Sequence, residues 1–239
     1  MRLQDNFEVE LKLSIVGDDP DALLNEIASL TTLAGMQLQN AQNHLLRDTY
    51  WDLPDGSLRA HKLSLRLRYM DDHPVFTVKG GTSSSDGLFR RYELEVPATI
   101  ENWHAVRAVL AGESIDLGPG ASGEASGPAP DGWLRAAGLS PTQDRTTRRT
   151  AIYAVPPDAD GDQPVAELAL DRTRFDFGKV LVDYWEIEIE QIGEQGDEVP
   201  RALGQALRDR YPDRLEPSTM GKYSRGLALE RELRTTGQL

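Results

Sequence analysis

The sequence predicts an α+β protein that is mainly β, in which eight strands close into a barrel and helices pack on its outside. Eight segments alternate between apolar and polar residues with a period of two, which is the pattern of a strand with one face on an apolar core. In at least five of these strands the polar face is charged. Segments with helical spacing lie between and after them, and such helices need an apolar surface to cover.

The expected elements follow one another along the chain. The strands cover residues 7–15, 44–52, 62–70, 74–80, 89–97, 147–155, 165–175 and 180–192. A helix begins after Asp19, which suits the N-cap, with Pro20 at the first helical position. Further helices are expected at 100–111, 198–211 and 221–234, with a short helical turn at "WLRAAG".

Residues 112–132 are rich in Gly, Pro, Ser and Ala, which is typical of a surface loop. We interpret this segment as an insertion within a single domain that covers residues 1–239, because the strands on both sides of it carry the same charged pattern. A chain of 239 residues is long enough for one large domain.

Composition narrows the classes of function. The chain has no cysteine, which excludes disulfides and thiolate metal sites and fits a cytoplasmic protein. No apolar run reaches 18 residues, so we expect no membrane association. The formal net charge of −13 argues against nucleic-acid binding, which needs a basic face. An anionic ligand could still bind where basic residues gather or where a metal ion intervenes.

The first strand shows the construction most clearly. In "FEVELKL" the side chains of Glu8, Glu10 and Lys12 share one face, because alternate side chains of a strand point to opposite sides. Apolar residues take the other face. Two carboxylates and an ammonium group are thereby in register on one side of a strand.

The later strands repeat this arrangement with both signs of charge. Their charged faces carry Tyr50 and Asp52; Lys62, Ser64, Arg66 and Arg68; Thr77 and Lys79; Arg91, Glu93 and Glu95; Glu167 and Asp171; and Glu186, Glu188 and Glu190. A solvated sheet face explains any one of these strands alone. Their number, and the near absence of neutral polar residues, favour instead a barrel whose charges face a hydrated lumen while its apolar residues face the helices.

The two signs of charge point to phosphate chemistry. Many carboxylates brought together cannot all stay ionised, and a divalent cation such as Mg²⁺ or Mn²⁺ resolves the repulsion with the oxygen ligands that it prefers. Guanidinium groups bind phosphate oxygens in a bidentate manner. Metal ligands and cations in one lumen are the usual arrangement for phosphoryl transfer.

At this point the residues resemble a known family. "EVELK" (Glu8, Glu10, Lys12) is similar to the ExExK signature of the CYTH family of triphosphate tunnel enzymes. In order there follow "RLR" at Arg66 and Arg68, "TVKG" at Lys79, "YELEV" at Glu93 and Glu95, "TRRT" at Arg148 and Arg149, "LALD" at Asp171, "WEIEIE" at Glu186 and Glu188, and "GKYSRG" at Lys222. The resemblance covers about residues 5–225 and implies an eight-stranded antiparallel closed β tunnel with helices outside.

The resemblance also implies roles for these residues. The triphosphate would be bound by basic side chains, namely Lys12, Arg66, Arg68, Lys79, Lys222 and one of Arg148 or Arg149. Metal ligation or water orientation would fall to Glu8, Glu10, Glu93, Glu95, Asp171, Glu186 and Glu188. We expect Glu8, Glu10 and Lys12 to take part in catalysis, and Lys222, in a C-terminal helix, to close over a tunnel mouth.

The expected function is metal-dependent hydrolysis of a triphosphate-containing small molecule, most similar to that of the bacterial inorganic triphosphatases acting on tripolyphosphate. An adenylate cyclase of class IV type, a thiamine triphosphatase and a non-catalytic binder of polyphosphate or nucleotide are alternatives, because all of them use the same charges. The resemblance is to the N-terminal module of the inorganic triphosphatases, so the chain is either a standalone form or part of a longer protein. Family resemblance further implies a homodimer.

Overall fold

The computed structural model of the chain describes residues 7–118, 129–157, 163–193 and 196–239. The strands are β1 (Phe7–Ile15), β2 (Thr32–Leu33), β3 (Met36–Asp52), β4 (Ser64–Met70), β5 (His73–Ser85), β6 (Leu88–Pro97), β7 (Ser140–Val155), β8 (Ala166–Asp176), β9 (Leu181–Gln191) and β10 (Leu215–Pro217). The helices are α1 (Pro20–Ala28), α2 (Ser57–Ala60), α3 (Ile100–Gly112), α4 (Pro130–Ala136), α5 (Glu198–Arg210) and α6 (Lys222–Thr235).

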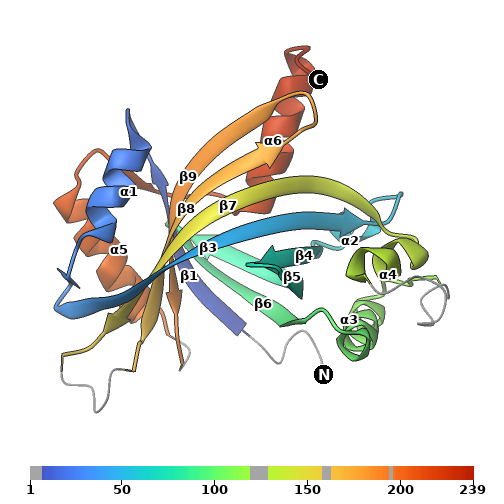
Figure 1. Cartoon of the computed structure of the whole chain (residues 1–239), viewed down its shortest axis with the longest axis horizontal. Coiled ribbons are helices and arrows are strands. Elements are labelled where there is room, and N and C mark those ends of the chain that lie inside the picture. The colour runs from blue at the N-terminus through green and yellow to red at the C-terminus, as the bar shows by residue number, and fades with distance from the viewer. Residues whose placement is uncertain (1–6, 119–128, 158–162, 194–195) are drawn as a thin grey trace. The chain divides into compact units, whose positions relative to one another are not determined.

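Eight strands close into an antiparallel barrel, as the sequence predicts. Hydrogen-bonded neighbours follow the order β1-β6-β5-β4-β3-β7-β8-β9, and β9 pairs with β1 again, so the path returns to its start. The strands can be followed by their labels in Figure 1. Outside this path, β2 pairs with β3 and β10 pairs with β1. The fold class, mainly β with helices, is therefore confirmed.

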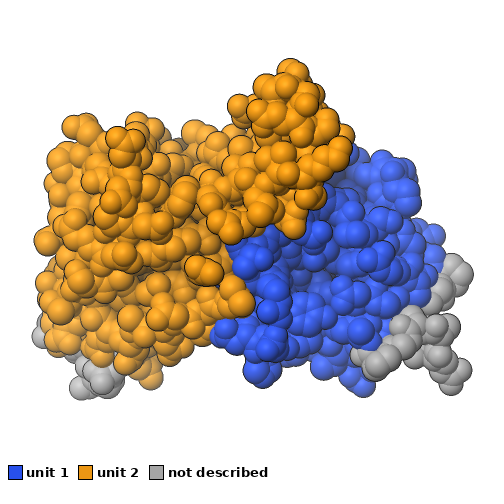
Figure 2. All heavy atoms as spheres, turned by 45° about the horizontal axis from the view of Figure 1, so that its top comes forward, with its two compact units in different colours: residues 1–7, 46–82, 91–146 blue, residues 8–45, 83–90, 147–239 orange. Residues whose placement is uncertain are grey.

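The chain forms two compact units (Figure 2). Unit 1 contains residues 1–7, 46–82 and 91–146, and unit 2 contains residues 8–45, 83–90 and 147–239. The expectation of a single domain over residues 1–239 stays a prediction. Of the Gly-rich insertion expected at 112–132, residues 119–128 lie outside the described residues, and α4 confirms the helical turn that follows it.

In unit 1 the core lies under α3 and α4. Trp103 and Leu110 of α3 pack in one cluster with Leu134 of α4 and with the buried leucines and aromatic residues of β4 and β5. On β4 the alternation of "SLRLRYM" puts Leu65 and Leu67 on this covered side. The arginines of the same strand therefore point to its other face.

In unit 2 the helices cover the apolar side of β1 and β8. Helix α1 buries its leucines and isoleucine, and α5 approaches β1 so closely that a Cβ atom at Gly204 would lie 2.6 Å from Leu11 Cδ2. The predicted cap of α1 is confirmed, because the Asp19 side chain accepts a hydrogen bond of 3.0 Å from the Ala22 amide and Pro20 opens the helix. The side chains of Glu10 and Lys12 point to the other face of β1, away from α5.

The structure departs from the expected elements at several places: β2 and β10 were not expected, and β5 extends to Ser85, beyond its expected end at residue 80. Strands β3 and β7 begin at Met36 and Ser140, earlier than predicted. The first half of β7 is polar on both faces, and in β3 the alternation of "MQLQ" stops at the polar run that follows, so neither segment shows a continuous strand pattern. Helix α2 was not expected. The carboxylate of Asp52 accepts hydrogen bonds from three backbone amides at and near this helix, so Asp52 is bound to the backbone instead of joining the charged face with Tyr50.

Candidate functional site

Charged side chains gather in two clusters, one in each unit. We define the arginine cluster of unit 1 as Asp48, Tyr50, Arg66, Arg68 and Arg145. We define the carboxylate cluster of unit 2 as Asp171, Glu186 and Glu188, with the three cations Lys12, Arg149 and Lys222 that contact it.

Strand register assembles the arginine cluster. Asp48 of β3 is directly opposite Arg68 of β4, and Tyr50 is opposite Arg66. On the other side of β4, Arg66 is opposite Thr77 of β5. Directly opposed residues have neighbouring side chains, so the register of β3, β4 and β5, together with the alternation within each strand, brings these groups together.

Asp48 is the centre of the arginine cluster. Arg68 donates two hydrogen bonds to its carboxylate, of 2.7 Å to Oδ1 and 2.9 Å to Oδ2, and Arg145 donates one of 3.1 Å to Oδ2. Nη1 of Arg66 lies 3.6 Å from Oδ2. Burial alone would raise the pKa of Asp48, which is 2% exposed, but the three guanidinium groups outweigh it and hold that pKa well below its usual range. Asp48 is therefore a fixed anion that orients three cations.

Arg145 also binds Tyr50. Its Nη2 donates a hydrogen bond of 2.8 Å to the Tyr50 hydroxyl, and its guanidinium lies 4.8 Å from the centre of the tyrosine ring. Burial would raise the pKa of Tyr50, yet Arg145 and Arg66 lower it below its ordinary value. The tyrosine thus has a structural partner within the cluster.

The predicted metal ligands of β6 lie beside the arginine cluster. Glu95 accepts hydrogen bonds of 3.2 Å from Arg66 and 3.0 Å from Thr77, and Glu93 forms an ion pair of 2.9 Å with Lys79. Burial would raise the pKa of Glu95, but Arg66, with Arg68 and Lys79, lowers it. These two glutamates belong to unit 1, whereas the other predicted metal ligands belong to unit 2.

Strand register also assembles the carboxylate cluster. Across β1, β9 and β8, Lys12 is opposite Glu188, and Ser14 is opposite Glu186, which is in turn opposite Asp171. Oxygen atoms of Asp171, Glu186 and Glu188 lie within 4.8 Å of one another. Three carboxylates on the consecutive strands β8 and β9 therefore converge on one point, and β1 brings Lys12 to them from a segment far away in the sequence.

Three cationic side chains surround these carboxylates. Arg149 of β7 donates to both oxygens of Asp171, at 2.8 and 2.6 Å, and to Glu188 Oε2 at 2.6 Å. Lys222, the first residue of α6, lies 2.8 Å from Asp171 Oδ2 and 2.8 Å from Glu188 Oε1, and also donates to Glu186 Oε1. Lys12 lies 2.7 Å from Glu10 Oε2 and also donates to Glu188 Oε1.

The pKa values of the three carboxyl groups are shifted in different directions. Burial opposes the charge of each, but Lys12, Lys222 and Arg149 hold the pKa of Glu188 well below its usual range. Arg149 and Lys222 lower the pKa of Asp171 in the same way. For Glu186 burial prevails and raises the pKa. Its Oε2 atom is buried and has no hydrogen-bond partner among the described residues.

The structure resolves one alternative and adds residues that the sequence analysis missed. Arg149 lies in the carboxylate cluster, while Arg148 is exposed. Asp48 and Arg145 were not predicted. Asp48 lies within a predicted strand and has the parity of Tyr50, so the alternation argument could have found it. Arg145 lies before the predicted start of its strand, in the polar half of β7, where no alternation marked it. Glu8 is buried on β1, on the face of Glu10.

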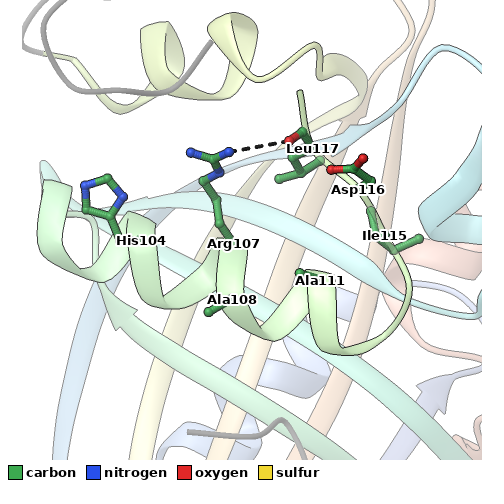
Figure 3. A pocket seen from close by; sticks show the side chains of 7 residues that line it. All are labelled: His104, Arg107, Ala108, Ala111, Ile115, Asp116 and Leu117. Carbon is green, nitrogen blue, oxygen red and sulfur yellow. Dashed lines mark hydrogen bonds between the residues drawn. The ribbon is translucent and has the colours of Figure 1, made fainter. Parts of the chain in front are cut away.

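A surface cavity in unit 1 is separate from these residues. It has a volume of about 300 Å³ and is lined by His104, Arg107, Ala108, Ala111, Ile115, Asp116 and Leu117, all on α3 or just after it (Figure 3). Arg107 donates to the backbone oxygens of Leu117, at 3.4 Å, and Gly118, at 3.2 Å. None of the lining residues belongs to either cluster.

Within the described residues, no helix is both long and apolar enough to cross a membrane.

Comparisons with known proteins agree with the fold. The family model of the CYTH domain matches residues 6–219. A Haemophilus influenzae protein described as an inorganic triphosphatase is 34% identical over 105 residues, which are 44% of this chain and 28% of that protein. The chain thus matches well under a third of that relative's length.

Two solved structures share the fold. A Hippeastrum protein, described as a putative adenylyl cyclase with a dominant triphosphatase activity, has a TM-score of 0.57 at 18% identity, over 92% of this chain and 95% of that chain. A Pyrococcus horikoshii protein has a TM-score of 0.50 at 17% identity, over 94% of this chain and 99% of that chain.

Proposed function

Because the chain belongs to the CYTH domain family, we propose that it is a metal-dependent hydrolase that splits inorganic tripolyphosphate into phosphate and pyrophosphate. The observation that carries the proposal is the carboxylate cluster, in which three acidic side chains on adjacent strands converge on one point amid cations. The partial match to an inorganic triphosphatase supports the choice of substrate.

The donor set of the carboxylate cluster fits a divalent metal ion. Asp171, Glu186 and Glu188 offer carboxylate oxygens within 4.8 Å of one another, and such oxygens are the ligands of Mg²⁺ and Mn²⁺. Glu186 Oε2 is buried and has no partner among the described residues, so it is a ligand atom that a bound cation would pair with. When bound, a metal ion would supply positive charge for the phosphoryl oxygens and lower the pKa of a water molecule. Glu93 and Glu95 are proposed as further acidic ligands.

Basic residues would bind the phosphate groups. We assign this task to Arg66, Arg68 and Lys79 in unit 1, and to Lys12, Arg149 and Lys222 in unit 2. Guanidinium groups match phosphate oxygens in a bidentate manner. Asp48 would act as a positioning residue, because it fixes the orientation of Arg66 and Arg68 before substrate arrives. Such preorganised charge is where much of the stabilisation of a transition state originates.

The reaction proposed for this site is a direct displacement by water. Water attacks the terminal phosphorus, the bond to the bridging oxygen breaks, and pyrophosphate leaves with the electron pair. Glu8 or Glu10 on β1 would orient the water and accept its proton, and Lys12, 2.7 Å from Glu10, would keep that carboxylate in place. No covalent intermediate with a side chain is needed.

The test is product release from three substrates measured side by side. Tripolyphosphate, ATP and thiamine triphosphate are incubated with Mg²⁺, Mn²⁺ or EDTA, and phosphate and cyclic AMP are quantified. We expect metal-dependent release of phosphate that is fastest from tripolyphosphate and is lost in Glu186→Gln. Cyclic AMP with pyrophosphate from ATP would make the protein a cyclase, preference for thiamine triphosphate would change the substrate, and inactivity on all three would contradict the proposal.

A further inference from the structure

Lys222 occupies the point on which the three carboxylates converge. Its Nζ atom contacts all of them, Asp171 and Glu188 at 2.8 Å each and Glu186 through Oε1. By comparison, Arg149 contacts Asp171 and Glu188, and Lys12 contacts Glu188. An ammonium group held by three carboxylates has the position and the partners of a bound cation.

Nearly every oxygen of the three carboxylates already has a cationic partner. Every carboxylate oxygen of Asp171, Glu186 and Glu188 except Glu186 Oε2 contacts a cationic side chain. Three carboxylates face three cations, and the neighbouring Glu10 and Glu167 contact Lys12 and Arg149 in turn. The Lys222 ammonium lies where the three carboxylates converge, so a divalent ion that joined this set unchanged would meet its positive charge at close range, which is costly in a buried place.

Lys222 is the cation best placed to leave. Arg149 and Lys12 belong to the paired strands β7 and β1, whereas Lys222 opens α6, directly after Gly221. Only three of the 14 residues of α6 are buried, namely Lys222, Gly226 and Leu233. Lys222 thus fills the centre of the carboxylate cluster. It is also one of the few buried residues that hold α6 in place.

We propose that Lys222 is an exchangeable internal cation, which holds the carboxylate cluster in the substrate-free protein, competes with the divalent ion for it, and moves to the anionic substrate when metal and substrate bind together. This inference rests on the proposed function, because it concerns the regulation of the same site. Binding equilibria that share a component are coupled reciprocally. The metal should therefore raise the affinity for tripolyphosphate, and tripolyphosphate should raise the affinity for the metal, through Lys222.

The test is calorimetric titration of the substrate-free protein with Mn²⁺. In Lys222→Met the competing charge is absent while the length of the side chain is kept, so Mn²⁺ should bind about 5- to 150-fold tighter than in the wild type, the range typical of coupling between sites. Lys222→Arg keeps the charge and should bind Mn²⁺ no more tightly than the wild type. Arg234→Met removes an exposed cation of the same helix and should change nothing. Equal or weaker binding of Mn²⁺ by Lys222→Met overturns the proposal.

A second measurement uses the wild type and does not depend on the variant folding. Hydrogen exchange of the first turns of α6 should become faster when Mn²⁺ is added alone, because Lys222 loses its partners, and slower again when tripolyphosphate is added as well. If hydrogen exchange of α6 is unchanged or slower with Mn²⁺ alone, the proposed displacement of Lys222 by the metal ion is overturned. Failure of metal-dependent hydrolysis would overturn the proposed function, whereas active wild type with no change of Mn²⁺ affinity in Lys222→Met would overturn only the role of Lys222.

Discussion

Replacing Asp48 by Asn should be strongly destabilising, because it removes the charge that holds three arginines together. Asp48 is 2% exposed and receives both arms of Arg68 as well as Nε of Arg145. Asparagine keeps one acceptor oxygen but directs an NH₂ donor at guanidinium donors. Removing one partner of a buried ion pair typically costs about 3–5 kcal/mol, and we expect a loss of this size in the free energy of unfolding at pH 7.

The chain offers a matched control on its surface. Asp183 accepts the same two-armed pair from Arg174, at 2.7 and 2.9 Å, but both side chains are largely exposed. Exposed ion pairs contribute about 0–1 kcal/mol, so Asp183→Asn should be nearly neutral. Urea unfolding followed by circular dichroism measures both variants. Equal losses for Asp48→Asn and Asp183→Asn would refute the reasoning that burial makes the difference.

The pH dependence gives an independent check of the same prediction. The pKa of Asp48 is lowered in the folded protein, so its ionised form stabilises the fold above the unfolded pKa of about 3.9. That stabilisation is lost as the pH falls through the lower, folded pKa. The difference between wild type and Asp48→Asn should therefore be constant from about pH 5 to 7 and shrink below about pH 4. A difference that stays constant down to pH 2 would contradict the charge as its cause.

Three further predictions concern single side chains. Arg149→Met should lower kcat/KM for tripolyphosphate about 100- to 1,000-fold, the cost of losing a preorganised cation, while Arg148→Met, at an exposed position, should leave it unchanged; equal effects would refute the choice between them. Glu186→Gln should weaken calorimetric Mn²⁺ binding about 10-fold or more, and unaltered affinity would remove Glu186 from the metal ligands. Gly204→Ala should cost about 1–3 kcal/mol in urea unfolding, because its Cβ meets the β1 leucine, whereas Gly112→Ala, with open space around it, should cost little; similar losses would contradict the close packing of α5.

Much of the fold was predictable because alternation carries direct physical information. In β1 and β4, one-residue alternation of apolar and charged side chains identifies both the strand and the face under the helices. The first half of β7 is polar on both faces, and in β3 only residues 36–39 alternate before a polar run, so both first halves were missed. Strand neighbours come from tertiary pairing, which no local pattern contains.

The candidate site was predictable in residue type but not in partnership. Asp48 and Asp52 have the same parity on one strand, yet one holds arginines and the other binds backbone amides of α2, a helix without a marked sequence pattern. Likewise, only the register of β7 separates Arg149 from Arg148. In each case the role depends on which groups a distant segment brings near, and this decides whether a charge is balanced.

The pairing of residues across β1, β9 and β8 limits where the chain can gain or lose residues. A shift of β9 by one residue would bring Ile187 or Ile189 into the position of Glu188 and turn its carboxylates toward the apolar side. A shift by two would keep the charges on their face but would move Glu188 away from Lys12, to a position opposite Ser14 or Glu10. Insertion or deletion of a single residue inside β9 should therefore disrupt the carboxylate cluster. The exposed turn at Gly178 lies outside these paired residues, so it can lengthen without disturbing them.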